Sequence, residues 1–317
     1  MSATPPEWPD YVDRPREDYG IFGPDSPSWK VWTHPTAVLG FQRAVTLETL
    51  DPHLTAAVWD TNKVREESAK RLRGTFDYFV TVAVADSRTV VEMSELLLRV
   101  HSYATGIDPI SGRRYNANNP ESQLWIHVTG WHSVLCCYER YGPGKLSPAE
   151  EQRFWADCVT AAEFQTCDPA DVPSSRAEVR EYYRMMRPKL CVSERQKELA
   201  SYFLYTPLAG NSPALWAGSR LMAPAVLATM PRWMRDVMGF RQSRLTSLLA
   251  RPVTKFGTWF FEPVEDRLAV LEVLAPTTGK IIAPALRGVE PLNKVTRTPA
   301  EARARYGSVN RRDAVAS

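Results

Sequence analysis

Residues 120–141 read PESQLWIHVTGWHSVLCCYERY, an apolar and aromatic stretch bounded on both sides by residues that interrupt regular structure. Asn119-Pro120 opens it, and proline is well suited to the first position of a helix. Gly142-Pro143-Gly144 follows it, and such residues end helices. The stretch therefore predicts a long helix from about residue 121 to residue 141.

Similar helical patterns recur along the chain. Residues 36–49 place apolar side chains close to one broad face, and Asp51-Pro52 ends that helix because proline disfavours a helical residue before it. Further helices are expected at residues 63–85, 87–105, 148–166, 175–186, 192–205, 213–229 and 231–250, and a loop at 106–120. Alternating strand patterns are scarce. We therefore predict an all-α fold, a single multi-helix domain of roughly ten helices.

The composition is that of a soluble globular chain. The 317 residues are 44% hydrophobic and 24% charged, which excludes wholesale disorder, a fibrous chain and a multi-span membrane protein. The longest apolar stretch, residues 221–230, is too short to span a bilayer. Five cysteines without a CxxC pair argue against a structural zinc site and against a disulfide framework, which favours a cytoplasmic protein.

The formal net charge of +3 is concentrated near the C-terminus. Residues 294–313 carry +4, so the remainder carries −1. A nearly neutral body is unlike a nucleic-acid-binding surface, so no nucleic-acid partner is expected. The basic tail allows peripheral contact with an anionic membrane, although a solvated tail is commoner. We predict an irregular lead at residues 1–20, one domain at 21–292 and a basic tail at 293–317.

The sequence holds few candidates for chemistry. It has no GxGxxG, GxSxG or HExxH motif and only five histidines. His101 and His127 fall inside predicted helices in apolar surroundings, where an unpaired ring costs about 1–3 kcal/mol. Each is either a core histidine bonded to a carbonyl or carboxylate, or a metal or haem-iron ligand or general acid/base. Arg71 and Thr75 share one helix face and, beside a helical histidine, could line a pocket for an anionic, oxygen-containing group.

A series of short motifs resembles the mpaB/latex-clearing-protein oxygenase family. Residues 71–75 (RLRGT) resemble its RLxxT helix, and residues 97–106 (LLRVHSYATG) resemble its VRxVHxxxxG. Residues 115–127 (YNANNPESQLWIH) resemble YxAxDPxxxLWVH. The other matches are residues 24–31 with PDS…W, 43–52 with RA…QxxHP, 146–150 with LSxxE and 230–240 with LPxxLR…LG. Each motif alone is weak, and the resemblance rests on their order and spacing.

The resemblance implies a fold with a globin-like core around haem b. The implied reaction is O₂-dependent oxidation, or cleavage of a carbon–carbon double bond, in a hydrophobic isoprenoid or lipid-like small molecule. It also implies that His101 is the axial ligand of the haem iron. Arg71 would pair with a haem propionate, and Thr75 would hydrogen-bond dioxygen or a propionate. His127 would be a distal catalytic group or a hydrogen-bond partner.

The chain departs from the family pattern at several positions. Glu48 and Asp51 stand where the family has glutamine and histidine, Gly74 replaces a lysine that can cap the iron, and Thr105 replaces an arginine. Two alternatives therefore stay open: a non-catalytic helical protein that binds haem or an apolar ligand, and a haem-free metal enzyme that uses both helical histidines with a carboxylate. Four aromatic side chains would suit either a substrate channel or an ordinary core: Phe76, Phe79, Trp125 and Trp131.

Overall fold

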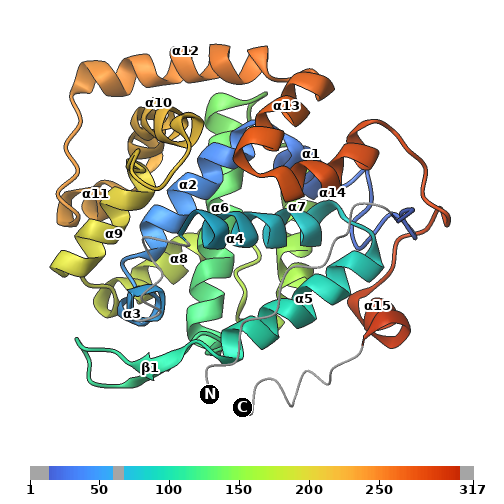
Figure 1. The fold of residues 1–317 in the computed structure, drawn as a ribbon, viewed down its shortest axis with the longest axis horizontal. Coiled ribbons are helices and arrows are strands. Elements are labelled where there is room, and N and C mark those ends of the chain that lie inside the picture. The colour runs from blue at the N-terminus through green and yellow to red at the C-terminus, as the bar shows by residue number, and fades with distance from the viewer. Residues whose placement is uncertain (1–13, 60–67, 308–317) are drawn as a thin grey trace.

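The predicted all-α fold is confirmed in a computed structural model, which describes residues 14–59 and 68–307 (Figure 1). Fifteen α-helices dominate these residues, and one two-stranded hairpin is the only sheet among them. The elements are α1 (Pro27–Thr33), α2 (Thr36–Glu48), α3 (Pro52–Trp59), α4 (Ser68–Val84), α5 (Ser87–Ser102), β1 (Thr105–Ile107), β2 (Arg114–Asn116), α6 (Pro120–Tyr141), α7 (Pro148–Ala162), α8 (Arg176–Met186), α9 (Glu194–Leu204), α10 (Pro213–Thr229), α11 (Arg232–Val237), α12 (Arg244–Phe260), α13 (Val264–Leu274), α14 (Pro276–Leu286) and α15 (Pro299–Tyr306).

Helices α2 and α6 pack closely against each other at the centre of the fold. The α6 helix starts where its sequence predicts, because the Asn119 side chain accepts hydrogen bonds from the first-turn amides and Pro120 fills the first position. The close approach depends on Gly40 in α2. A Cβ atom at that position would lie 2.5 Å from the Val134 Cα atom of α6. Only glycine therefore fits this crossing.

Aromatic side chains fill the core beside these two helices. The Trp32 ring stacks on Phe79 with centroids 5.4 Å apart, and it meets the Trp131 ring edge-on at 5.7 Å. Trp125 is fully buried as well. Of the four aromatic residues that would suit a channel or a core, all are buried in the core, and Phe76 also lines the pocket described below.

The structure has fifteen helices among the described residues where roughly ten were expected, and it differs from the sequence-based prediction in several segments. The predicted loop at 106–120 contains the β1–β2 hairpin, in which Gly106 pairs with Tyr115. The single helix predicted at 231–250 is two helices, α11 and α12. Gly239 between them has φ +78°, a left-handed conformation that ends α11.

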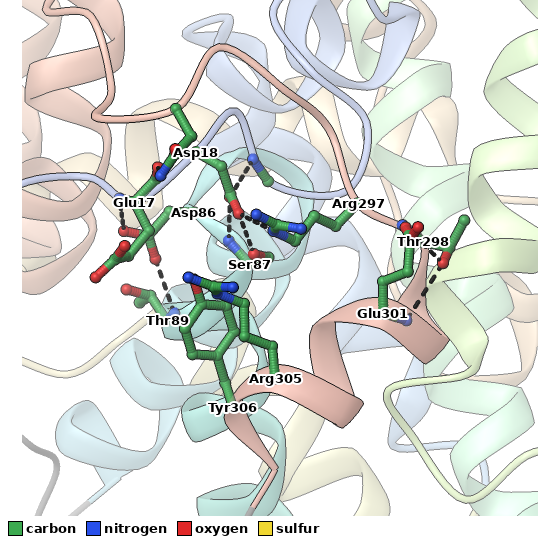
Figure 2. A network of polar contacts seen from close by, with 12 residues as sticks. Glu17, Asp18, Asp86, Ser87, Thr89, Arg297, Thr298, Glu301, Arg305 and Tyr306 are labelled. Atoms are coloured by element: carbon green, nitrogen blue, oxygen red, sulfur yellow. Dashed lines mark hydrogen bonds and ion pairs between the residues drawn. The ribbon is translucent and has the colours of Figure 1, made fainter.

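Both ends of the described chain pack onto the helical body. Tyr19 N donates to the Val295 carbonyl and Arg297 N donates to the Gly20 carbonyl, both at 2.9 Å. Figure 2 shows the polar network at this junction, in which the buried Asp18 carboxylate meets Arg297 and Ser87. The domain limits stay a prediction, but residues 293–307 lie along the helical body, with Pro299 and Ala302 buried and most other side chains exposed.

Helix α12 lies on the outside of the fold, across α10 and the end of α6 (Figure 1). Thr258 Oγ1 donates to the Tyr141 carbonyl at 2.7 Å, and Gln242 Nε2 donates to the Pro224 carbonyl at 3.1 Å. These bonds fix both ends of α12. Among the described residues, neither this helix nor any other has the length and apolarity needed to cross a bilayer.

Candidate functional site

Helices α4 and α5 carry three of the four predicted site residues. Arg71 and Thr75 belong to the first half of α4, and His101 lies in the last turn of α5. The helices run in opposite directions from the short connection at Ala85-Asp86, so these residues lie toward the ends away from it (Figure 1). Thr75 is half-buried, and the side chain of Arg71 lies outside the described residues.

His101 is half-buried and contacts α6 through Gln123. Gln123 Nε2 lies 3.3 Å from His101 Nδ1 and donates to the Ala117 carbonyl at 2.6 Å. Because a carbonyl can only accept, the Ala117 bond fixes the orientation of the Gln123 amide. His101 Nδ1 is then the acceptor, so the proton of the neutral ring lies on Nε2. Sequence reasoning missed Gln123, whose one signal is its position four residues before His127 on the same helix face.

The His101–Gln123 pair tests how this histidine fits a haem iron. A ligating imidazole binds through an unprotonated nitrogen and donates from its other nitrogen to an acceptor. In the described arrangement Nδ1 faces a donor instead. Ligation through Nε2 therefore requires the ring proton to move to Nδ1 and the Gln123 amide to turn its oxygen toward the ring. His101 can serve as an iron ligand only with that rearrangement, which also breaks the hydrogen bond between Gln123 and the Ala117 carbonyl.

His127 occupies the interface between α6 and α7. Its Nε2 donates to the Cys158 carbonyl at 2.8 Å, and its ring lies 5.8 Å from that of Trp131. Burial lowers the pKa of His127 to about 4, against hydrogen bonds to Cys158 and Gln165. The residue is thus a neutral, buried histidine bonded to a carbonyl. Its catalytic role stays a prediction.

The two helical histidines do not form a metal site with a carboxylate. Within residues 14–59 and 68–307, no cluster of three histidine, cysteine, aspartate or glutamate side chains could hold a metal ion. His101 turns toward Gln123, whereas His127 turns toward Cys158. The described residues therefore give the haem-free metal alternative no support. A haem iron needs only one protein ligand and is not tested by this observation.

A buried polar cluster joins α2, α6 and α8. The guanidinium of Arg43, fully buried, donates to Ser133 Oγ at 2.6 Å and to the Thr229 carbonyl. Tyr183 OH lies 3.2 Å from His132 Nδ1. Burial, together with the charges of Arg43 and Arg176, lowers the pKa of His132 to about 3. The charged Arg43 side chain is therefore held in the core by uncharged hydrogen-bond partners.

Glu48 and Asp51, the two departures near the end of α2, have different surroundings. Glu48 Oε1 accepts a hydrogen bond from Thr129 Oγ1 at 3.1 Å, and burial raises the pKa of Glu48 to about 8. Asp51 accepts a hydrogen bond from Leu54 N at 3.0 Å and so caps the start of α3. Asp51 therefore has a structural use here, whereas Glu48 is a carboxyl group that is protonated at neutral pH.

A mainly apolar pocket lies between α2, α4, α9, α10 and the end of α13. Its cavity volume is about 80 Å³, and the empty space reaches about 740 Å³ only when the part open to solvent is counted. Thr75, His101 and His127 do not line it. Its wall consists of Val38, Phe41, Gln42, Leu72, Arg73, Phe76, Tyr202, Phe203, Thr206, Asn211, Leu215, Ser219, Met222, Leu274 and Ala275. Thr75 therefore lies on a different face of α4 from the pocket residues Leu72, Arg73 and Phe76.

Gln42 gives this pocket a polar feature. Its Nε2 faces three carbonyl oxygens, those of Phe203, Leu204 and Ser219, at 3.0–3.2 Å. These contacts fix the amide orientation. The buried Oε1 atom has no hydrogen-bond partner among the described residues. The pocket thus has a mainly apolar wall, and Gln42, one of its lining residues, carries a buried acceptor without a partner among the described residues.

Comparison with known proteins places the chain among oxygenases. The family model described as "ER-bound oxygenase mpaB/B'/Rubber oxygenase, catalytic domain" matches residues 29–259. This range contains α2 to α11 complete, with the predicted site residues and most of the pocket wall. No curated protein and no solved structure matches the chain at a significant level.

Proposed function

The chain belongs to the mpaB/rubber oxygenase catalytic-domain family, and from this premise we propose that it is a haem b-dependent oxygenase that oxidises a hydrophobic small molecule with O₂. The family match over residues 29–259 carries the proposal. It includes Arg71, Thr75, His101 and His127, in the motifs on which the resemblance rests. The proposed reaction is oxidation, or cleavage of a carbon–carbon double bond, in an isoprenoid or lipid-like substrate.

In this proposal the chain supplies the haem ligand and the groups around it. His101 would hold the haem iron through Nε2, and Gln123 lies beside its Nδ1 atom. Arg71 pairs with a propionate because a guanidinium matches a carboxylate as a two-pronged donor. Thr75 offers a hydroxyl group on the same face of α4. Haem b, when bound, supplies the centre at which dioxygen is activated.

The pocket beside α4 suits the apolar part of such a substrate. Phe41 and Phe76 pack at 5.0 Å between ring centroids and form one wall, and Leu215 belongs to the wall from α10. Gln42 lines the pocket, and its unpaired Oε1 atom, buried in this structure, would accept a hydrogen bond from a hydroxyl group that reached it. A terpenoid or lipid alcohol combines these two properties.

Haem binding is tested by the absorption spectrum of the purified protein, oxidised and reduced. We expect a Soret band and about one haem per chain, as for a single axial histidine. His101→Ala should lose the band or shift it strongly. The matched control is His53→Ala, which removes a half-buried histidine from α3. An unchanged Soret band in His101→Ala would refute the ligand assignment.

A non-catalytic protein that binds an apolar ligand is the second candidate, and the pocket is the observation that favours it. The two candidates differ in oxygen consumption. An oxygenase consumes O₂ when an isoprenoid alcohol such as farnesol is added to the haem-loaded protein, whereas a binding protein takes up the alcohol without consuming O₂. Ligand uptake with no oxygen consumption across a panel of such alcohols would favour the second candidate.

A further inference from the structure

Helix α12 carries a continuous apolar stripe that faces away from the protein. Seven of its side chains, spaced three or four residues apart, are between 52% and 72% exposed. They are Leu245, Leu248, Leu249, Val253, Phe256, Trp259 and Phe260. Single exposed apolar residues are ordinary, but a contiguous stripe of this length marks an interaction surface.

The anchored face of α12 lies opposite this stripe. Ala250 and Thr258 are the buried positions of the helix, and Thr258 bonds the end of α6. At 100° per residue, Ala250 and Thr258 fall on one side of the helix and the apolar stripe is centred on the other. Because α12 already packs against the protein through the face that carries Ala250 and Thr258, the exposed stripe is not the face that attaches the helix to the core.

Basic residues run along one edge of the stripe. Arg244, Arg251 and Lys255 are all exposed and fall within a narrow arc beside it. The helix has no acidic residue. The next acidic side chains follow its end, and one of them, Glu265, is paired with Arg287. The outer surface of α12 is thus apolar at its centre and positive along one side.

We propose that α12 docks the protein onto an anionic lipid bilayer. The helix would lie in the plane of the interface, with Phe256 and Trp259 inserted at the boundary between headgroups and acyl chains. Arg251 and Lys255 would contact phosphate groups. Aromatic residues favour this depth, and each basic residue near an anionic surface strengthens binding. This docking does not depend on whether the chain binds haem.

The charges favour a membrane over a second copy of the chain. A dimer through this face would bring three more basic side chains to the interface without an acidic partner, since α12 contains none. An anionic bilayer satisfies the apolar stripe and the basic edge together. The fluid acyl chains of the bilayer also adapt to a convex row of side chains, whereas a protein partner would need a groove of matching shape.

Vesicle flotation tests the docking. The full-length protein is mixed with phosphatidylcholine vesicles, with or without phosphatidylglycerol, and we expect it to float with the anionic vesicles. Leu248→Ser/Phe256→Ser should weaken the partition by at least about tenfold. Arg251→Glu/Lys255→Glu should weaken it by roughly tenfold or more on anionic vesicles. Brominated acyl chains should quench the fluorescence of the wild type, and much less that of Trp259→Phe.

Matched substitutions elsewhere control for general effects. Ile107→Ser removes a side chain that is 61% exposed on β1, and Lys280→Glu reverses an exposed charge on α14. Both should float like the wild type, and thermal melting curves should show that all variants are folded. Failure of the wild type to bind anionic vesicles would overturn the proposal, and so would equal binding of the variants. A dimer in light scattering that Leu248→Ser/Phe256→Ser converts to a monomer would identify a second copy as the occupant and would also overturn it.

Discussion

Arg297 Nε donates to Asp18 Oδ2 at 2.8 Å, and this ion pair joins two segments that are 279 positions apart in the chain. The Asp18 carboxylate is fully buried, whereas the Arg297 side chain is 22% exposed. Ser87 N and Gly20 N donate to the other carboxylate oxygen at 2.8 and 2.9 Å. A buried carboxylate thus holds the N-terminal segment, the start of α5 and the C-terminal segment together (Figure 2).

Replacing Arg297 should destabilise the whole fold. Arg297→Ala leaves the buried Asp18 charge without the cation that is hydrogen-bonded to it, and removing one member of a buried pair costs about 3 kcal/mol or more. Because backbone hydrogen bonds to Asp18 remain, we expect the free energy of unfolding to fall by about 2–3 kcal/mol. Chemical denaturation measures this change.

The exposed pair of Arg287 and Glu265 provides the control. Their side chains are 52% and 71% exposed, and such pairs contribute at most about 1 kcal/mol. Arg287→Ala should therefore change the free energy of unfolding far less than Arg297→Ala does. Equal effects of the two substitutions would contradict the structural role given to the Asp18 junction.

The buried Glu48 carboxyl group should make the protein less stable as pH rises from the ordinary pKa of glutamate to about 8. Burial raises its pKa to about 8 in the folded chain, so the folded state holds a proton that the unfolded state releases at lower pH. The resulting stability is present below the ordinary pKa of glutamate and is lost as pH rises through about 8. Glu48→Gln keeps the size of the side chain and removes the ionisation. It should be more stable than the wild type at pH 9 by about 2 kcal/mol, with little difference at acidic pH.

Urea denaturation of both proteins across this pH range measures the effect of Glu48. Glu181→Gln is a suitable control, because Glu181 is exposed on α8 and pairs with Arg184. The control should keep the loss of stability that the wild type shows as pH rises to about 8. If Glu48→Gln loses stability with rising pH as steeply as the wild type, the carboxyl group is not the cause.

The helices were predictable where local chemistry determines them. Prolines and caps at Asn119-Pro120 and Ser147-Pro148 mark helix starts in the sequence as clearly as in the structure. The break at Gly239 was missed, because a glycine inside an apolar pattern does not reveal its φ angle. The packing of residues 293–307 was also missed, since it depends on Asp18, whose burial no local pattern shows.

The sequence identified candidate site residues, but it did not predict how they are arranged in space or which residues contact them. Family motifs singled out His101, but its partner Gln123 becomes visible only when α5 and α6 pack together. The pocket likewise draws on five helices, and the open acceptor of Gln42 depends on carbonyl groups more than 160 positions away. Tertiary contacts of this kind leave no periodic signal in a single sequence.

Filling the pocket should block ligand uptake. Leu215 belongs to the pocket wall on α10, and Leu215→Trp adds bulk there. We expect at least about tenfold weaker binding of farnesol, measured by displacement of an apolar fluorescent probe. Leu221→Trp makes the same change on the same helix at a position that is 80% exposed and outside the wall. Equal affinity in the two variants would show that the ligand binds elsewhere.

Because His127 is buried, we expect the protein to lose stability as the pH falls below the ordinary pKa of histidine. Burial lowers its pKa to about 4, so between the ordinary histidine value and about pH 4 the unfolded chain binds a proton that the folded chain does not. Stability therefore falls as pH decreases through this window. His127→Gln keeps a donor for the Cys158 carbonyl and cannot be protonated there. Its absolute stability will drop through altered packing, but the difference between pH 7 and pH 4.5 should shrink by about 2 kcal/mol.

His53→Gln on α3 should leave that difference nearly unchanged, because His53 is half-buried beside Ser111 and not enclosed in the core. An acid sensitivity that survives His127→Gln in full would assign it to the other buried histidines, His34 and His132, whose pKa values burial also lowers.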